Sequence, residues 1–196
     1  MISYAEIRKA AWRFLIDNDV TALPLDVGEI CRRNGWHLLS LDADENMIVA
    51  RILDKSGAYG NCDAFSCWYK NSVLIFYKTS THPGRLLFAI AHEFGHISLS
   101  HFYGRRPEEH EREANMFAAR ILMPLCVLHE CRVQSAREIS ELCATSHTAA
   151  RYRLGRLHYI EKHGEFYKHE IEKVVADNFK PFINKYITTK EAAYGN

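Results

Sequence analysis

Residues 86–97 read LLFAIAHEFGHI, an apolar run that passes into the pattern H-E-x-x-H. Side chains four residues apart lie on one face of an α-helix, so His92 and His96 can reach the same ion. Neutral imidazole is a good zinc ligand, and this spacing therefore predicts a metal-bearing helix. Glu93 directly follows the first histidine, where it can take a proton from a water at the open position of the metal.

The apolar context of the motif favours this interpretation over a chance match to five residues. Polar side chains within such a helix are buried and need partners. The alternative is a pair of histidines that only satisfy each other or their neighbours on a half-buried helix.

A catalytic zinc usually has three protein ligands and one open position, so another segment has to supply a ligand. His101 lies five residues past His96, about 140° further round an α-helix, and cannot join from the same helix. The metzincin pattern H-E-x-x-H-x-x-G-x-x-H is disfavoured, because Leu99 and Phe102 stand at its glycine and third histidine.

The next predicted helix, residues 107–123, offers three candidate ligands: His110, Glu111 and Glu113. A glutamate from a following helix is the gluzincin arrangement, but spacing alone does not choose among the three. A helical wheel places His110 and Glu111 slightly nearer than Glu113 to the centre of the apolar stripe. Glu111 could equally belong to a solvated charge run with its neighbours.

The surrounding segments predict an α+β fold, with helices, then a small sheet, then helices. Apolar spacing and capping residues predict helices over 4–17, 26–33, 85–100, 107–123, from 135 and from 145 to 157. Runs rich in β-formers predict strands over 36–41, 47–53, 65–69 and 73–77, the last two as a hairpin.

Composition excludes several classes of protein. Lys and Arg total 25 against 24 for Asp and Glu, so no global field attracts nucleic acid or an anionic membrane. Charges at Glu6, Arg8 and Lys9 interrupt the place of a signal peptide, and no apolar run could span a bilayer. We therefore expect a cytoplasmic protein without a membrane segment, and six reduced, mostly buried cysteines.

Two segments together resemble a known family. FAIAHEFGH at 88–96 and EREANMFAARILMP at 111–124 are similar to the ImmA/IrrE-type metallopeptidases of bacteria and phages. The resemblance extends upstream to LPLDVGEICRRNGWHL and DAFSCWYKNSVLIFYK, and downstream to the arginine-rich segment 151–157, so that it covers about residues 20–158.

The resemblance implies a zincin-like metallopeptidase domain over 1–128, followed by a helical segment over 129–196 packed on it. It makes His92 and His96 zinc ligands and Glu93 the general base. It matches Glu113 to the glutamate of E-A-N and so implies Glu113 as the third ligand, in place of the residues that the wheel favours. Asn115 matches the family asparagine and is expected to hydrogen-bond a ligand.

The function implied by the resemblance is zinc-dependent endopeptidase activity. The implied substrate is a helix-turn-helix transcriptional repressor, cut at a defined site to derepress a mobile element or a stress regulon. One alternative is a zinc-containing regulator or antirepressor that binds its partner without cutting it. The presence of Glu93 argues against that alternative, because structural zinc needs no such carboxylate. Another is the toxin of a two-gene operon, with the same chemistry and a different partner.

Residues 135–158 resemble a helix-turn-helix. Over 147–163, Arg151, Arg153, Arg156 and Lys162 exceed Glu161 by three charges. A DNA reader usually has a stronger basic surface, so we do not expect DNA binding.

A peptidase also needs a group that stabilises the oxyanion. The candidates are His101, Tyr103, His147, Arg151 and Tyr152, and the sequence does not rank them.

Overall fold

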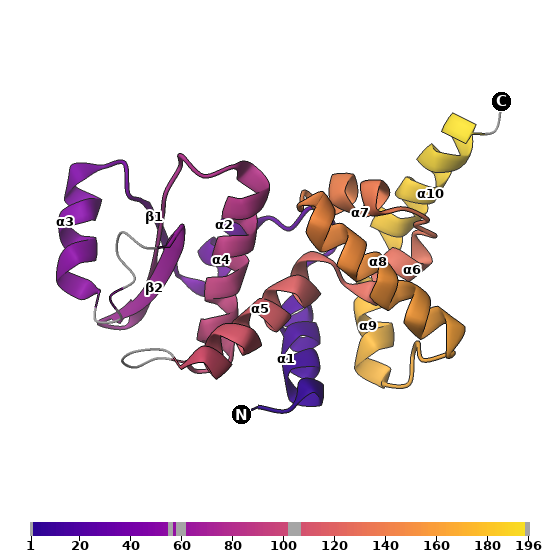
Figure 1. Ribbon diagram of the computed structural model, residues 1–196, viewed down its shortest axis with the longest axis horizontal. Helices are drawn as coiled ribbons and strands as arrows, with labels where there is room; N and C mark the ends of the chain where they lie inside the picture. The colour runs from indigo at the N-terminus through magenta and orange to yellow at the C-terminus, as the bar shows by residue number, and fades with distance from the viewer. Residues whose placement is uncertain (1, 55–56, 58–61, 102–106, 195–196) are drawn as a thin grey trace. The chain divides into compact units, whose positions relative to one another are not determined.

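The computed structural model describes residues 2–54, 57, 62–101 and 107–194 (Figure 1). The chain forms two compact units: Met1–Ala10 with Asp26–Ala118, and Ala11–Leu25 with Ala119–Asn196. Helices α1 (Tyr4–Asp17) and α5 (Glu108–Leu122) each contribute residues to both units, so neither unit is a continuous stretch of chain. The domain boundary expected after residue 128 stays a prediction.

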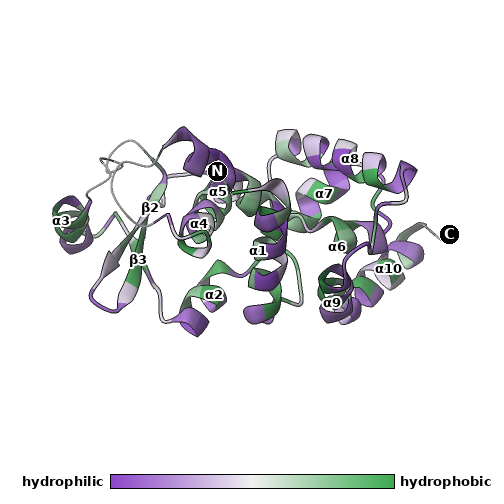
Figure 2. Cartoon of the chain, turned by 90° about the horizontal axis from the view of Figure 1, so that it is seen from below, coloured by the Kyte–Doolittle hydropathy of each residue, from purple (hydrophilic) through white to green (hydrophobic). Residues whose placement is uncertain are grey.

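The first unit is built on a three-stranded mixed sheet of order β1-β3-β2. The antiparallel strands β2 (Ala64–Tyr69) and β3 (Ser72–Tyr77) form the predicted hairpin, and β1 (His37–Ser40) runs parallel to β3. The central strand β3 buries its apolar residues and is hydrophobic along most of its length in Figure 2. The α+β prediction is confirmed.

Residues 47–53, predicted as a strand, belong instead to helix α3 (Asp44–Leu53), so that prediction was wrong. The β-branched residues suggested a strand, but Met47, Ala50 and Leu53 recur every third residue and pack together into a core under the sheet. Ile48 and Ile52 point outward, with 59% and 72% of their surface exposed. Acidic residues in the first turn and Arg51 in the last also suit a helix dipole.

Helix α4 (Pro83–Ser98) carries the H-E-x-x-H pattern and packs on β2 and β3, so the sheet lies between α3 and α4 (Figure 1). Pro83 opens the helix, where its missing N–H costs nothing, and the ring of His82 accepts a hydrogen bond from the Gly84 amide. Phe94 is fully buried and its ring contacts Trp36. This packing fixes the rotation of α4 about its axis.

Helix α2 (Val27–Asn34) begins and ends as predicted. Asp26 accepts a hydrogen bond from the Glu29 amide, and Gly35 ends the helix with φ +65°. The left-handed conformation at Gly35 turns the chain directly into β1.

The second unit consists of helices. They are α6 (Leu125–Glu130), α7 (Ala136–Cys143), α8 (His147–Lys162), α9 (Glu170–Asn178) and α10 (Lys180–Tyr194). Ser135 and Ser146 cap α7 and α8 through their hydroxyl groups, and α7 packs against α8. The three-residue connection places Ala144 at φ +50°. These two helices occupy the segment in which a helix-turn-helix was predicted.

All six cysteines lie among the described residues, and none of them forms a disulfide. Burial raises the pKa of the Cys31 thiol to about 11 and that of Cys126, Cys131 and Cys143 to about 12. Among the described helices, none combines the length and the apolar character that a membrane span requires.

Candidate metal centre

A glycine on α4 lets α5 approach closely. A Cβ placed on Gly95 would lie 2.9 Å from the Cα and 3.0 Å from the carbonyl oxygen of Ala114, closer than real Cβ atoms come to backbone. Ala114 is itself fully buried. The two small residues therefore set the distance between the histidines of α4 and the polar side chains of α5 that flank Ala114.

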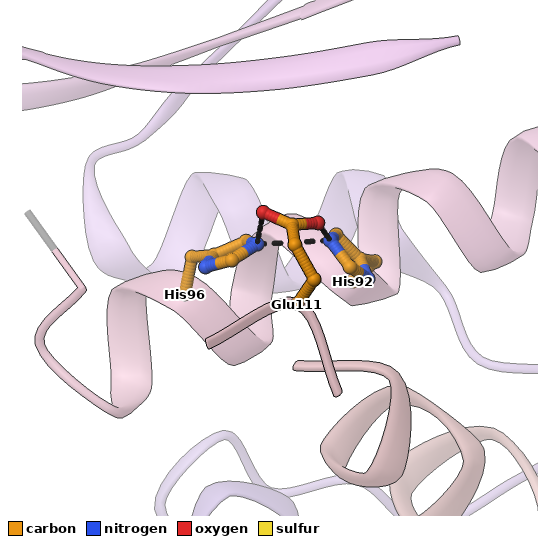
Figure 3. Close-up of side chains that lie close together, drawn as sticks. All are labelled: His92, His96 and Glu111. Carbon is orange, nitrogen blue, oxygen red and sulfur yellow. Dashed lines mark hydrogen bonds and ion pairs between the residues drawn. The ribbon is translucent and has the colours of Figure 1, made fainter. Parts of the chain in front are cut away.

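Three side chains from the two helices converge on one point, as Figure 3 shows. The Nε2 atoms of His92 and His96 lie 2.9 Å apart. The carboxylate of Glu111 spans them, with Oε2 3.1 Å from Nε2 of His92 and Oε1 3.4 Å from Nε2 of His96. The two rings are inclined by 72°, so their in-plane lone pairs meet rather than run side by side. All three donor atoms lie within 4.8 Å of one another.

The spacing of these atoms suits zinc. Ligands at 2.0–2.1 Å in a tetrahedral site lie about 3.3 Å from each other, and the three observed separations are 2.9, 3.1 and 3.4 Å. Two imidazoles and one carboxylate are a ligand set that catalytic zinc commonly uses.

Asn115 hydrogen-bonds the ring nitrogen of His92 that faces away from the site. Its Oδ1 lies 2.9 Å from Nδ1 of His92. An amide oxygen only accepts, so Nδ1 carries the ring proton and Nε2 turns its lone pair toward the site. Asn115 follows Glu111 by four residues, and both therefore project from one face of α5. The structure thus brings Asn115, which the resemblance singled out, to a histidine of the site.

Glu113, the third ligand implied by the resemblance, lies elsewhere. Its carboxylate is 2% exposed, accepts a hydrogen bond from the Ile2 amide at 2.7 Å and lies 3.0 Å from Nε2 of His101. Glu111 and Glu113 are two residues apart, about 200° around the helix, so they face different ways. The structure brings Glu111, not Glu113, to His92 and His96. The helical wheel had favoured Glu111 and His110 equally, and His110 does not join this group.

His101 comes back to the motif because α4 ends before it. Ser100 adopts φ +61°, and the His101 amide donates to the carbonyl of His96 at 2.9 Å, which reverses the chain. Nδ1 of His101 then lies 3.1 Å from Nδ1 of His96. His101 had been excluded as a ligand on the assumption that the helix continues past His96. His101 does not join the three converging groups, but it contacts the Nδ1 atom of His96, on the side of the ring away from the other two groups.

His101, His110 and Glu113 form a second group of side chains that could hold a metal. The rings of His101 and His110 are stacked 4.0 Å apart with an angle of 1° between their planes. Lone pairs lie in the ring planes, so those of two parallel rings do not converge on one ion. Burial, together with the positive charge that His110 and His96 can carry, lowers the pKa of His101 to about 4, so its ring is neutral at pH 7.

Glu93 is 2% exposed and receives a hydrogen bond of 2.6 Å from the hydroxyl of Ser66 on β2. This bond orients the carboxylate that the motif identifies as a general base. Ser66 was not predicted from the sequence, because a serine in a hairpin strand carries no signal of such a contact. The contact between the Ile2 amide and Glu113 was not predicted either, since 111 residues separate the two in the sequence.

The candidates for oxyanion stabilisation are distributed across the chain. Both ring nitrogens of His101 contact other side chains. Tyr103 lies outside the described residues. The remaining three, His147, Arg151 and Tyr152, belong to the second unit.

The fold and the converging histidines and carboxylate are those of a metallopeptidase-like domain. The family described as Peptidase_M78, IrrE N-terminal-like domain, matches residues 31–156, which include β1, the hairpin, α4 and α5. The chain belongs to this family, as the resemblance predicted. Members are peptidases that generally depend on zinc. No curated protein matches the chain.

Proposed function

We propose that this chain is a zinc-dependent endopeptidase, with His92, His96 and Glu111 as the zinc ligands. The observation that carries the proposal is the convergence of these three side chains, with the buried Glu93 next to His92 in the sequence. Zinc, when bound, supplies Lewis-acid polarisation of the scissile carbonyl and makes water a nucleophile at neutral pH. Glu93 accepts the proton of the attacking water and passes it to the leaving amine. Ser66 holds the Glu93 carboxylate in position for this transfer.

The substrate binds in an extended conformation along β2. In the described sheet β2 is an edge strand, and peptides add to sheet edges through backbone hydrogen bonds. Ser66 contacts Glu93 from the same strand, so a peptide on β2 would run close to the general base. This placement favours an unfolded or extended segment of a protein as the substrate.

The substrate we propose is a helix-turn-helix transcriptional repressor of a mobile element or stress regulon, cut at one site in the cytoplasm. Family membership and the paired motifs at 88–96 and 111–124 support this choice. The second candidate function is a zinc-containing antirepressor that binds without cutting. The hydrogen bond between Ser66 and Glu93 favours the enzyme, since a purely structural zinc needs no oriented carboxylate beside it. A toxin of a two-gene operon would use the same site on another partner.

The test compares the wild type with Glu93→Gln in cells of the source organism, with and without DNA damage. The variant keeps the three ligands and should bind one zinc per chain, but it lacks the general base. New protein N-termini are mapped in both strains. A terminus inside a small DNA-binding protein, present only with the wild type, would establish cleavage and name the substrate. Identical profiles under several stresses, with zinc bound in both proteins, would move the assignment to the antirepressor.

A further inference from the structure

We propose that Glu113 and His101 are positioning residues of the metal centre, which hold the ring of His96 with its Nε2 lone pair toward the ion. The inference rests on the proposed zinc site. It gives Glu113 a role in that site other than direct coordination.

The hydrogen bonds of Glu113 determine which nitrogen of His101 carries the ring proton. A carboxylate only accepts hydrogen bonds. The carboxylate of Glu113 accepts one from the Ile2 amide at Oε1, and its Oε2 lies against Nε2 of His101. Nε2 of His101 must therefore carry the ring proton and donate it. In a neutral imidazole, the other nitrogen of the ring then has a lone pair and no proton.

His101 in turn determines which nitrogen of His96 carries the ring proton. Nδ1 of His101 accepts, so the proton in the 3.1 Å contact between the two Nδ1 atoms belongs to His96. Nε2 of His96 then presents a lone pair to the point where the Nε2 lone pair of His92 also arrives. The tautomer of each ligand histidine is thus determined by a hydrogen bond at its Nδ1 atom. Asn115 makes this bond to His92, and the Glu113–His101 pair makes it to His96.

The three side chains of this hydrogen-bonded chain are buried. The side chains of His96, His101 and Glu113 are 1%, 3% and 2% exposed, so water cannot replace the hydrogen bonds between them. The turn at Ser100 supplies the geometry, since its left-handed conformation is what returns His101 to His96. A carboxylate acting through an imidazole also increases the basicity of the ligand histidine more than a neutral amide does.

A second metal ion at His101, His110 and Glu113 is the competing interpretation of the same residues. The parallel stack of His101 and His110 argues against it, because no single ion lies in the planes of both rings. Nδ1 of His101 is also directed at His96 rather than away from it. The two interpretations differ in zinc stoichiometry, so one titration separates them.

The experiment measures zinc affinity by competition with a chelator, using zinc alone and the full chain. His101→Phe removes both ring nitrogens, and Glu113→Gln is nearly isosteric, which keeps the test available should the first variant fold poorly. Both should bind one zinc between 10- and 100-fold more weakly than the wild type, the range typical of such outer partners. His110→Phe keeps a stacking ring on His101 and is the matched control, with unchanged affinity expected.

A second readout does not depend on the loaded enzyme. Nitrogen-15 spectra of the metal-free protein should show His96 protonated at Nδ1 in the wild type and His110→Phe, and a mixture of tautomers in His101→Phe. Wild-type affinity together with an unchanged His96 spectrum in both His101→Phe and Glu113→Gln would overturn the inference. Two zinc ions per chain, falling to one in His110→Phe, would overturn it in favour of a second metal site. Failure of the wild type to bind any zinc would instead refute the proposed function.

Discussion

Gly95 on α4 lies directly against Ala114 on α5, where a Cβ added to the glycine would come within 3.3 Å of the Cβ of Ala114 as well as striking its backbone. In the sequence, Gly95 lies between the two ligand histidines, and Ala114 lies between Glu111 and Asn115. The metal centre therefore depends on a helix crossing that tolerates no side chain at one position.

Gly95→Ala should weaken zinc binding at least tenfold and lower the melting temperature, because α5 must shift away from α4 to make room for the methyl group. Forcing extra carbon into a packed interior typically costs about 1–3 kcal/mol. Calorimetry and zinc competition measure the two effects.

Gly155→Ala is the control for Gly95→Ala. Gly155 lies in α8 with nothing within 4 Å of its added Cβ, so alanine there should stabilise the helix by about 0.5–1 kcal/mol. Equal zinc affinity in Gly95→Ala and the wild type would show that the close crossing does not determine the site.

Glu111→Ala should lose most of its zinc, since it removes the carboxylate that the structure brings to His92 and His96. Glu109→Ala, in the same turn of α5, removes an equal charge and should keep zinc near one per chain. Metal analysis after gel filtration distinguishes them. Full zinc retention in Glu111→Ala would remove Glu111 from the ligand set.

Removal of zinc should lower the thermal stability of the first unit. Without the ion, two imidazole nitrogens and a carboxylate converge within 3.4 Å and lose the cation that compensates them. A ligand that binds only the folded state stabilises it in proportion to the logarithm of its concentration over its dissociation constant. The melting temperature should fall with a chelator and return on adding zinc, whereas His92→Ala should show no response to either.

Ser66→Ala should lower kcat by about tenfold with zinc content unchanged, the loss expected when one hydrogen bond to a charged group is removed. Glu93→Gln, which removes the base itself, should cost about 10²–10⁴-fold. Ser72→Ala is a useful control, because the Ser72 hydroxyl on the neighbouring strand donates to the Gly35 carbonyl rather than to the site. A Ser66→Ala enzyme with wild-type kcat would mean that the contact with Glu93 is not used in catalysis.

The raised pKa values of the buried cysteines predict that the free energy of unfolding decreases at high pH. The pKa of the Cys31 thiol is raised from 9.0 to about 11 by burial, and those of three other thiols to about 12. The unfolded chain therefore loses these protons first, so the free energy of unfolding is unaffected below about pH 9 and falls as pH rises toward 12. Cys126→Ala should flatten this fall, which urea titrations across the pH range can measure.

Local sequence determined much of the fold. Asp26 and Gly35 bound α2, Ser135 and Ser146 cap α7 and α8, and the hairpin of β2 and β3 follows from two apolar runs around a polar turn. Each of these is a contact between residues a few positions apart, which spacing can encode. The convergence of His92 and His96 is of the same kind, since four residues on a helix place both imidazoles on one face.

Tertiary structure decided the rest. Residues 44–53 form a helix, because three apolar side chains meet a core that other segments build. Glu111 rather than Glu113 faces the histidines because the contact of Ala114 with Gly95 sets the rotation of α5. The helical wheel had favoured His110 and Glu111 together, and the resemblance had implied Glu113, so neither identified this rotation by itself. His101 returns to His96 because α4 stops at a left-handed Ser100. Sequence alone determined which residue types could bind a metal, whereas packing between distant segments decided which of them face one another.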